Sequence, residues 1–374
     1  VKEKIPETLY VSTSINNYNS IIQARQTRLY YPDTLSDINS NSNSVINIKL
    51  NESGDDFIDP ATAKLFFQAR INKDDLTDGG LFQDGPFVFF ERAELFISGN
   101  MVEELPHCHE LINSLTYFSC SRDWMTSKEA QDMNFWRYVG HDSSRIDSVA
   151  LDGAMDTLET ISANHHFMLS EIPVFDKEAN SYLYQTYCIP LSTVFGLFRV
   201  SQFLNSNILK GIEIKLYINS YQNACLELEN QSAIPISLGA GLSRKAYRLE
   251  TTRTTVATTR TFTLKNIKVS CDLMTLHQSY VQSLKTLASS STGFVIMIDS
   301  WLYSSEVVTQ SPASITILRS VSSLKDIWCL LRRNSLDYQD SAHESSSHDL
   351  TKYRVSLGSK SLTQHEITTL AESY

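Results

Sequence analysis

Residues 45–50, VINIKL, and residues 65–71, LFFQARI, place apolar side chains at every second position. This period of two is typical of a β-strand with one buried face, and Val, Ile and Phe suit such a surface. Short segments of the same kind recur at 87–98, 182–189, 211–219, 224–229, 247–250, 261–272, 294–303, 314–318, 327–331 and 353–357. Because these segments do not alternate regularly with helices, they predict antiparallel β-sandwiches instead of a parallel sheet.

Helical periodicity is confined to a few short segments. Residues 109–117, 155–161, 192–198 and 278–288 carry apolar side chains at helical spacing. We therefore expect short helices inserted between strands of an all-β protein.

The organisation of the chain is predicted from its linkers. Residues 36–44, SDINSNSNS, form a polar low-complexity segment, and the composition changes again between residues 230 and 260, where Pro, Gly and Thr accumulate. These features predict an N-terminal arm over 1–44, one sandwich over 45–229 and a second over 230–374. The stretch around 123–177 is too long for a plain hairpin loop and is predicted to be an insertion in the first sandwich.

Composition excludes several classes of protein. The 374 residues are 42% hydrophobic and 20% charged, and the formal net charge is −10. This acidic balance, with no Lys/Arg-rich run, argues against a protein that mainly grips nucleic acid, so direct sequence-specific contact with nucleic acid is not expected. No segment reaches the ~20 apolar residues of a membrane span, and the first eight residues do not resemble a signal peptide. The six scattered cysteines are expected to be free buried thiols.

No motif predicts catalysis or a cofactor. The chain lacks a GxSxG elbow, a phosphate-binding glycine loop and a GxGxxG turn. Residues 106–110, PHCHE, resemble metal ligands, but no second ligand pair lies at usable spacing, and His165-His166 stands alone, so no metal is predicted. Adjacent carboxylates such as Asp55-Asp56 and Glu103-Glu104 are interpreted as solvated charges. Two carboxylates far apart in sequence still leave a glycoside-cleaving or carbohydrate-binding β-sandwich as an alternative.

Several segments are more specific than any of these motifs. Residues 45–75 give a strand, an acidic turn, a second strand and a charged turn. Residues 90–104, FERAELFISGNMVEE, read as a hairpin, and 110–118, ELINSLTYF, as the helix that follows it. Residues 188–219 combine an IPL segment with a GIEIKLYIN strand, and 353–359 read YRVSLGS. These segments resemble the double jelly-roll major capsid proteins of the Polinton/Maverick, adintovirus and virophage kind. The match departs at Leu209-Lys210, where that family often has Leu-Pro.

The resemblance implies a fold and a role. It implies two tandem jelly rolls, three copies of the chain in a pseudo-hexameric capsomer, and an icosahedral shell of a DNA virus or virus-like element. The implied partners are two further copies, neighbouring capsomers, penton or minor capsid proteins, and an inner membrane or membrane-associated protein beneath the shell. The implied location is the virion, and no catalytic residue or cofactor is implied.

Candidate subunit contacts come from the insertion and the arm. Trp124, Trp136 and Tyr138 lie in the insertion, which we expect either to reach a neighbouring subunit or form a capsomer tower, or to pack on its own chain. Tyr30 and Tyr31 lie in the arm, which either ties to a protein beneath the shell or is disordered in the free subunit. The alternative within the structural class is a penton or minor capsid protein with one jelly roll, which a single eight-stranded sandwich would favour.

Overall fold

The computed structural model describes residues 22–33, 37–41, 45–51, 54–72, 79–82, 85–121, 124, 175–176, 181–182, 184–230, 236–237, 242–244, 247–249, 261–290, 295–309, 312–317, 323–329, 352–358 and 360–361. The chain divides into two units. The first comprises residues 1–303 and 337–342, and the second comprises 304–336 and 343–374.

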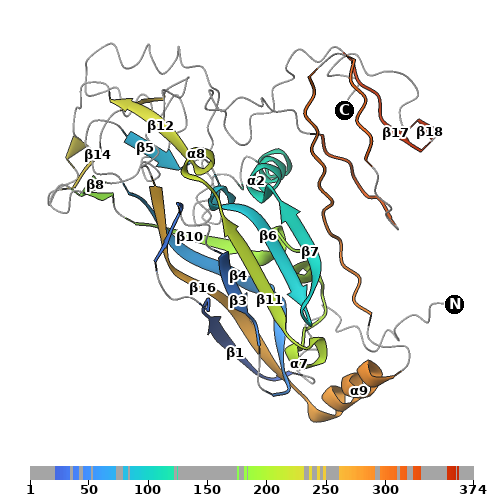
Figure 1. Ribbon diagram of the computed structural model, residues 1–374. Coiled ribbons are helices and arrows are strands. Elements are labelled where there is room, and N and C mark those ends of the chain that lie inside the picture. Colours follow the sequence, from blue (N-terminus) through green and yellow to red (C-terminus); the bar gives the residue numbers. More distant parts are fainter. Residues whose placement is uncertain are drawn as a thin grey trace. The chain divides into compact units, whose positions relative to one another are not determined.

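The first unit contains two large antiparallel sheets (Figure 1). In sheet A, the strand order is β1 (Ile22–Tyr30), β16 (Thr261–Leu276), β4 (Asp56–Asn72) and β10 (Gln185–Pro190), and the short β2 (Ile38–Asn39) also pairs with β16. In sheet B, the order is β3 (Val45–Lys49), β11 (Ile212–Ile218), β6 (Phe90–Ile97) and β7 (Asn100–Pro106).

This strand order is that of a jelly roll. Along the chain, the eight strands of the two four-strand paths are β1, β3, β4, β6, β7, β10, β11 and β16. The first pairs with the last (β1–β16) and the second with the seventh (β3–β11). The third pairs with the sixth (β4–β10) and the fourth with the fifth (β6–β7). Such nested antiparallel pairing is the double Greek key of a jelly roll, in which two sheets face each other across one core. The predicted all-β jelly-roll class is therefore confirmed for the first unit.

The bounds predicted for the first sandwich are wrong. Strand β1 lies within the predicted N-terminal arm, and β16 lies beyond the predicted boundary at residue 229, yet the two pair with each other in sheet A. The jelly roll therefore runs from Ile22 to Leu276. The linker at 36–44 is a connection inside the fold, because β2 within it pairs with β16.

The core of the jelly roll is rich in aromatic rings. Phe67 of β4 stacks on Tyr187 of β10 at 5.1 Å between ring centroids and meets Phe89 and Phe90 edge-on at 5.3 and 5.4 Å. Phe262 of β16 contacts Phe89 at 5.5 Å. Offset and edge-to-face pairs add stabilisation beyond the burial of their area. The rings join sheet A to the short helix η2 (Pro86–Phe89), which leads into sheet B.

The hairpin between β6 and β7 was predicted from residues 90–104 and is confirmed. Its two turn residues, Ser98 and Gly99, have φ values of 54° and 76°. Positive φ at both positions is the geometry of a tight two-residue hairpin, and it matches the right-handed twist of the flanking strands. The helix expected at 109–117 is α2 (Cys108–Ser119).

The remaining helical predictions have different outcomes. Helix α9 (Gln278–Ser289) confirms the prediction at 278–288. The predicted helix at 192–198 is two 3-10 turns, η3 (Leu191–Thr193) and η4 (Gly196–Arg199). Two single-turn helices, α7 (Ser206–Leu209) and α8 (Tyr221–Ala224), were not predicted. The segment 155–161 lies outside the described residues. No helix in the described ranges is long and apolar enough to cross a membrane.

The second unit is described only in part. Its β17 (Ser356–Leu357) pairs with β18 (Lys360–Ser361), and only β17 lies within the strand that was predicted at 353–357. The described residues of the predicted strands at 314–318 and 327–331 join no β-ladder. The second jelly roll over 230–374 therefore stays a prediction, apart from β16, which belongs to the first.

All six cysteines are free thiols, as predicted. Cys108, Cys225 and Cys271 are buried, whereas Cys329 is exposed and Cys120 and Cys188 are half-buried. The expectation of burial is thus correct for half of them.

Phe67→Ala should lower the free energy of unfolding by about 3–5 kcal/mol, because it removes the ring at the centre of the aromatic cluster and leaves a cavity. The control is Phe66→Ala on the same strand, since Phe66 points to the other face and is only half-buried. Urea denaturation followed by tryptophan fluorescence measures both variants. Equal losses would contradict the register of β4.

Candidate interaction surfaces

Three long connections leave the same end of the jelly roll. They join β4 to β6, β7 to β10, and β11 to β16. Because neighbouring strands are antiparallel, the ends of these six strands lie together. Figure 1 shows the short strands β5, β8, β12 and β14 beyond that end of β4, β10 and β16.

Short strands link the three connections. Strand β12 (Cys225–Asn230) pairs with β5 (Gly79–Phe82) on one side and with β15 (Tyr247–Leu249) on the other. Strand β14 (Leu242–Arg244) pairs with β8 (Phe175–Asp176) and β13 (Ile236–Ser237), and β8 also pairs with β9 (Ser181–Tyr182). Each connection therefore supplies strands to a small sheet shared with another connection. We call this assembly of β5, β8, β9 and β12–β15 the distal sheets.

Asn219 fixes the point where β11 turns into the distal sheets. Its side chain is buried, and its Nδ2 donates to the carbonyl oxygen of Val88 at 2.9 Å. Its Oδ1 accepts from the backbone N–H of Ser220 at 2.9 Å and from Nδ2 of Asn223 at 3.2 Å. Ser220 then caps α8, which leads into β12. A buried amide satisfied in this way orients the backbone around it.

The five predicted contact residues lie in different environments. Tyr30 is only 6% exposed and belongs to the core at the end of β1, whereas the next residue, Tyr31, is 54% exposed. Trp124 is half-buried and packs against the same core. Trp136 and Tyr138 lie outside the described residues, as does most of the insertion 123–177. Burial corrects the expectation for Tyr30, because a core side chain does not reach a neighbouring subunit.

Glu103 is a buried carboxylate that the sequence did not reveal. It was interpreted with Glu104 as a solvated charge, but it is 4% exposed. The N–H of Gly196 donates to Oε2 at 2.8 Å and the N–H of Leu197 donates to Oε1 at 2.9 Å. Ser300 donates its hydroxyl to the same carboxylate. Both oxygens are therefore occupied, which favours a structural role for Glu103 over that of an acid catalyst.

Glu103 holds a segment that we call the strap, residues 295–303. The side chains of Ile296, Ile298 and Trp301 pack against the core, and the guanidinium of Arg199 lies 5.7 Å from the Trp301 ring. The strap approaches η4 closely at Gly196, where a Cβ would lie 1.9 Å from the carbonyl oxygen of Asp299. Only glycine fits there, because any side chain would clash with this backbone.

The other face of the strap is uncovered. Met297 is 79% exposed, and Val295 and Leu302 are also exposed. The strap thus carries apolar residues on an inner face that packs on the jelly roll and on an outer face that does not. It is the last described segment of the first unit before residue 304.

Residues 106–110 lie at the start of α2. His107 is the residue before α2, with φ at 49°, in agreement with the interpretation of this segment as a helix start. Cys108 donates its thiol to the carbonyl oxygen of Phe90 at 3.0 Å, and burial raises the pKa of this thiol to about 12. In this structure the thiol is therefore engaged with a backbone carbonyl. Within the described residues, no group of three His, Cys, Asp or Glu side chains converges. His165 and His166 lie outside them.

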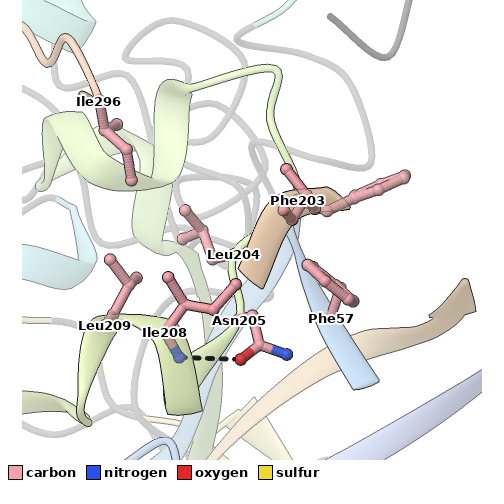
Figure 2. A pocket seen from close by; sticks show the side chains of 8 residues that line it. Phe57, Phe203, Leu204, Asn205, Ile208, Leu209 and Ile296 are labelled. Carbon is pink, nitrogen blue, oxygen red and sulfur yellow. Dashed lines mark hydrogen bonds between the residues drawn. The ribbon is translucent and has the colours of Figure 1, made fainter. Parts of the chain in front are cut away.

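A small apolar pocket lies near the start of β4, at the opposite end from the distal sheets. Figure 2 shows the side chains that line it. It is lined by Phe57, Phe203, Leu204, Asn205, Ile208, Leu209, Leu284 and Ile296. The one polar side chain, that of Asn205, accepts from the N–H of Ile208 at 3.0 Å and donates to the carbonyl oxygen of Asp56 at 2.9 Å. With an apolar lining and no carboxylate, the pocket lacks the two facing acids that glycoside cleavage requires.

Comparisons with known proteins give structural matches only. No protein-family model and no curated protein matches the chain. Among solved structures, it is similar to the Faustovirus major capsid protein, with 11% identity and a TM-score of 0.36 over 70% of this chain and 56% of that one. It is also similar to VP54 of PBCV-1 fitted into a reconstruction of the virophage Sputnik, with 10% identity and a TM-score of 0.30. A PBCV-1 capsid model gives 11% identity and a TM-score of 0.30.

The chain spans about half the length of these structures, since each of the two PBCV-1 matches covers 70% of this chain and 44% of that one. The jelly-roll assignment of the first unit rests on its strand order.

Stability should depend on pH through Glu103. Burial raises the pKa of this carboxyl above its ordinary 4.5, and the hydrogen bonds from Leu197, Gly196 and Ser300 only partly offset that effect. Between pH 4.5 and the raised pKa, the folded protein binds more protons than the unfolded protein. The contribution of Glu103 to the free energy of unfolding therefore falls as the pH rises through this window.

Urea denaturation of the wild type and of Glu103→Gln across this pH range measures the effect. The free energy of unfolding of the wild type minus that of Glu103→Gln should fall as the pH rises through this window, because Gln does not titrate. A difference that is constant with pH would contradict the burial of an ionisable carboxyl at this position.

Proposed function

We propose that the chain is a structural subunit of a viral shell, of the major capsid type. Three copies would form a pseudo-hexameric capsomer, and capsomers would tile an icosahedral virion of a DNA virus or virus-like element. The role is mechanical and not catalytic. Closed symmetry suits it, because one repeated contact between copies then covers a surface.

The observation that carries this proposal is the combination of jelly-roll order with long connections at one end. A compact sandwich with short loops would need no distal sheets. Here the connections after β4, β7 and β11 are held together by pairing between strands from different connections. This arrangement supports a tower at one end of a wall-like sandwich, which is one of the two roles expected for the insertion 123–177.

The segments that carry the sequence resemblance also support the proposal. Residues 45–75 contain β3 and β4, residues 90–104 are the β6–β7 hairpin, and residues 188–219 contain part of β10 and all of β11. The resemblance thus falls on strands of the jelly roll in their order along the chain. In the second unit, the YRVSLGS segment at 353–359 includes β17.

Exposed apolar residues in the second unit are consistent with assembly. Val307, Val308, Ile315, Ile317 and Trp328 are exposed. Where exposed apolar side chains lie together, they mark surfaces that become covered. The proposed partners are the two other copies in the trimer, neighbouring capsomers, and penton or minor capsid proteins. A membrane or membrane-associated protein beneath the shell is a further proposed partner, and the Trp124 and Tyr31 side chains are the proposed contacts within the described residues.

A second candidate function is that of a penton or minor capsid protein with one jelly roll. The observation in its favour is that the described residues contain one complete eight-stranded sandwich, from Ile22 to Leu276. A penton protein would sit at fivefold positions, so it would form pentamers instead of trimers.

The solution mass of the purified protein separates the two. Multi-angle light scattering should give a species of about three times 42.3 kDa, and negative-stain images of that species should show a hexagonal outline. A pentamer would support the second candidate. A monomer at every concentration would contradict both shell proposals and would lead to a carbohydrate-binding screen.

A further inference from the structure

The outer face of sheet A carries cations that are far apart in the sequence. Lys64 and Arg70 come from β4, and Lys265 and Lys268 come from the adjacent β16. Each lies next to buried, inward-facing residues on its own strand, so its side chain points away from the core. Lys64 is exposed and the other three are half-buried. We call these four side chains the basic face.

A β-bulge creates this face. Side chains three residues apart on a regular strand point to opposite faces, so Lys265 and Lys268 would not share one. The register between β16 and β4 shifts between these two lysines, and Asn266 there has φ at 53°. A bulge inserts an extra residue and redirects the side chains after it. Asn266 supports it by donating from Nδ2 to Oε1 of Gln68 on β4 at 2.7 Å.

The strand register places the four cations close together. Lys265 lies opposite Gln68, and Lys268 lies opposite Phe66, both between Lys64 and Arg70 on β4. Residues that share a face of a strand are about 6.8 Å apart, and neighbouring strands about 4.8 Å apart, so the basic face is about 20 Å long. That length suits an extended segment or a flat surface better than a small molecule.

Two of the cations converge on one aromatic ring. The Nζ of Lys265 lies 3.3 Å from the centroid of the Tyr184 ring, and the Cζ of Arg70 lies 4.5 Å from it. The ring attracts both cations but brings no negative charge. Within the part of the chain that the structure describes, none of the four cations of the basic face forms an ion pair.

The outer face of sheet B differs in this respect. There Lys49 pairs with Asp33 at 2.8 Å, Arg92 pairs with Glu94 at 3.2 Å, and Lys215 pairs with Glu213 at 3.8 Å. The three cations named on sheet B therefore have carboxylate partners within the chain. Sheet A also contains one such pair, Arg25 with Asp272, but the four cations of the basic face have no ion-pair partner among the described residues.

We infer that the basic face docks on a carboxylate-rich surface of a second copy of this chain. The chain has 42 acidic and 32 basic side chains. A second copy therefore carries an excess of carboxylates that can pair with the basic face. Complementary charge of this kind sets orientation and speeds association. The inference rests on the proposed self-assembling shell and names one of its contact surfaces.

The double variant Lys265→Glu/Lys268→Glu tests this contact. Its control is Lys49→Glu/Lys215→Glu, which changes the net charge equally on the outer face of sheet B. Sedimentation velocity at low and high salt measures self-association, and circular dichroism checks that the variants are folded. Lys64→Glu is a milder single variant of the same face for use if the double variant fails to fold.

The sheet A variant should raise the dissociation constant for self-association by roughly tenfold or more, and the control should change it much less. Wild-type association should also weaken with added salt, because salt screens exposed charges. Equal effects of the two variants, or none, would overturn the inference while a wild-type trimer still supports the shell proposal. A wild-type monomer would contradict both.

A nucleic-acid role for the basic face would overturn the inference in another way. The probe is a thymidine oligonucleotide, titrated into the wild type and the sheet A variant. The inference predicts no difference between them. Binding that the variant abolishes, with self-association unchanged, would assign the basic face to nucleic acid instead.

Discussion

The jelly roll depends on the pairing of its first strand with its last. Arg25 of β1 donates from Nε to Asp272 of β16 at 2.7 Å, across 247 residues of chain. Thr27 donates to the other oxygen of the same carboxylate at 2.7 Å. Burial acts to raise the pKa of Asp272, but the hydrogen bonds from Thr27 and Arg25 lower it overall. The ion pair thus favours one register between β16, which is rich in buried apolar side chains, and β1, most of whose side chains are exposed.

That pairing is the outermost one in the nested order of the strands. β1 pairs with one edge of β16, β4 pairs with the other edge, and β10 pairs with the far edge of β4. The same nesting in sheet B places β11 between β3 and β6. The long connections then have to emerge together at one end, where the distal sheets join them, and Glu103 holds the strap against β7 and η4. Non-local closure of this kind costs loop-closure entropy before its contacts form, which slows the folding of such topologies.

Much of the sandwich could be predicted from period-two alternation, but its ends could not. β1 reads IQARQTRLY, and most of its side chains are exposed on both faces, so it has no apolar alternation to detect. β16 was recognised as a strand, but the partner that it meets lies at the other end of the jelly roll, which periodicity does not report. The boundary near residue 230 was predicted from a change in composition. That change lies in the connection between β11 and β16, which supplies strands to the distal sheets.

The candidate sites show the same limit. Glu103 looked like one of two solvated acids, since adjacent residues on a strand face opposite sides and sequence does not say which side is buried. The basic face was invisible because its cations are dispersed along the chain, and a bulge at Asn266 decides that Lys265 and Lys268 share a face. Tyr30 and Tyr31 looked equivalent in sequence, but only Tyr31 is exposed.

Disulfide trapping between β1 and β16 tests the closure of the jelly roll most directly. The variant Thr27→Cys/Asp272→Cys places two thiols where side chains already meet, and Gln26→Cys/Asp272→Cys shifts one thiol to the opposite face of β1. After mild oxidation, peptide mass spectrometry should find an intramolecular link in the first variant and not in the second. Equal linking in both, or none in the first, would contradict the pairing of the first strand with the last.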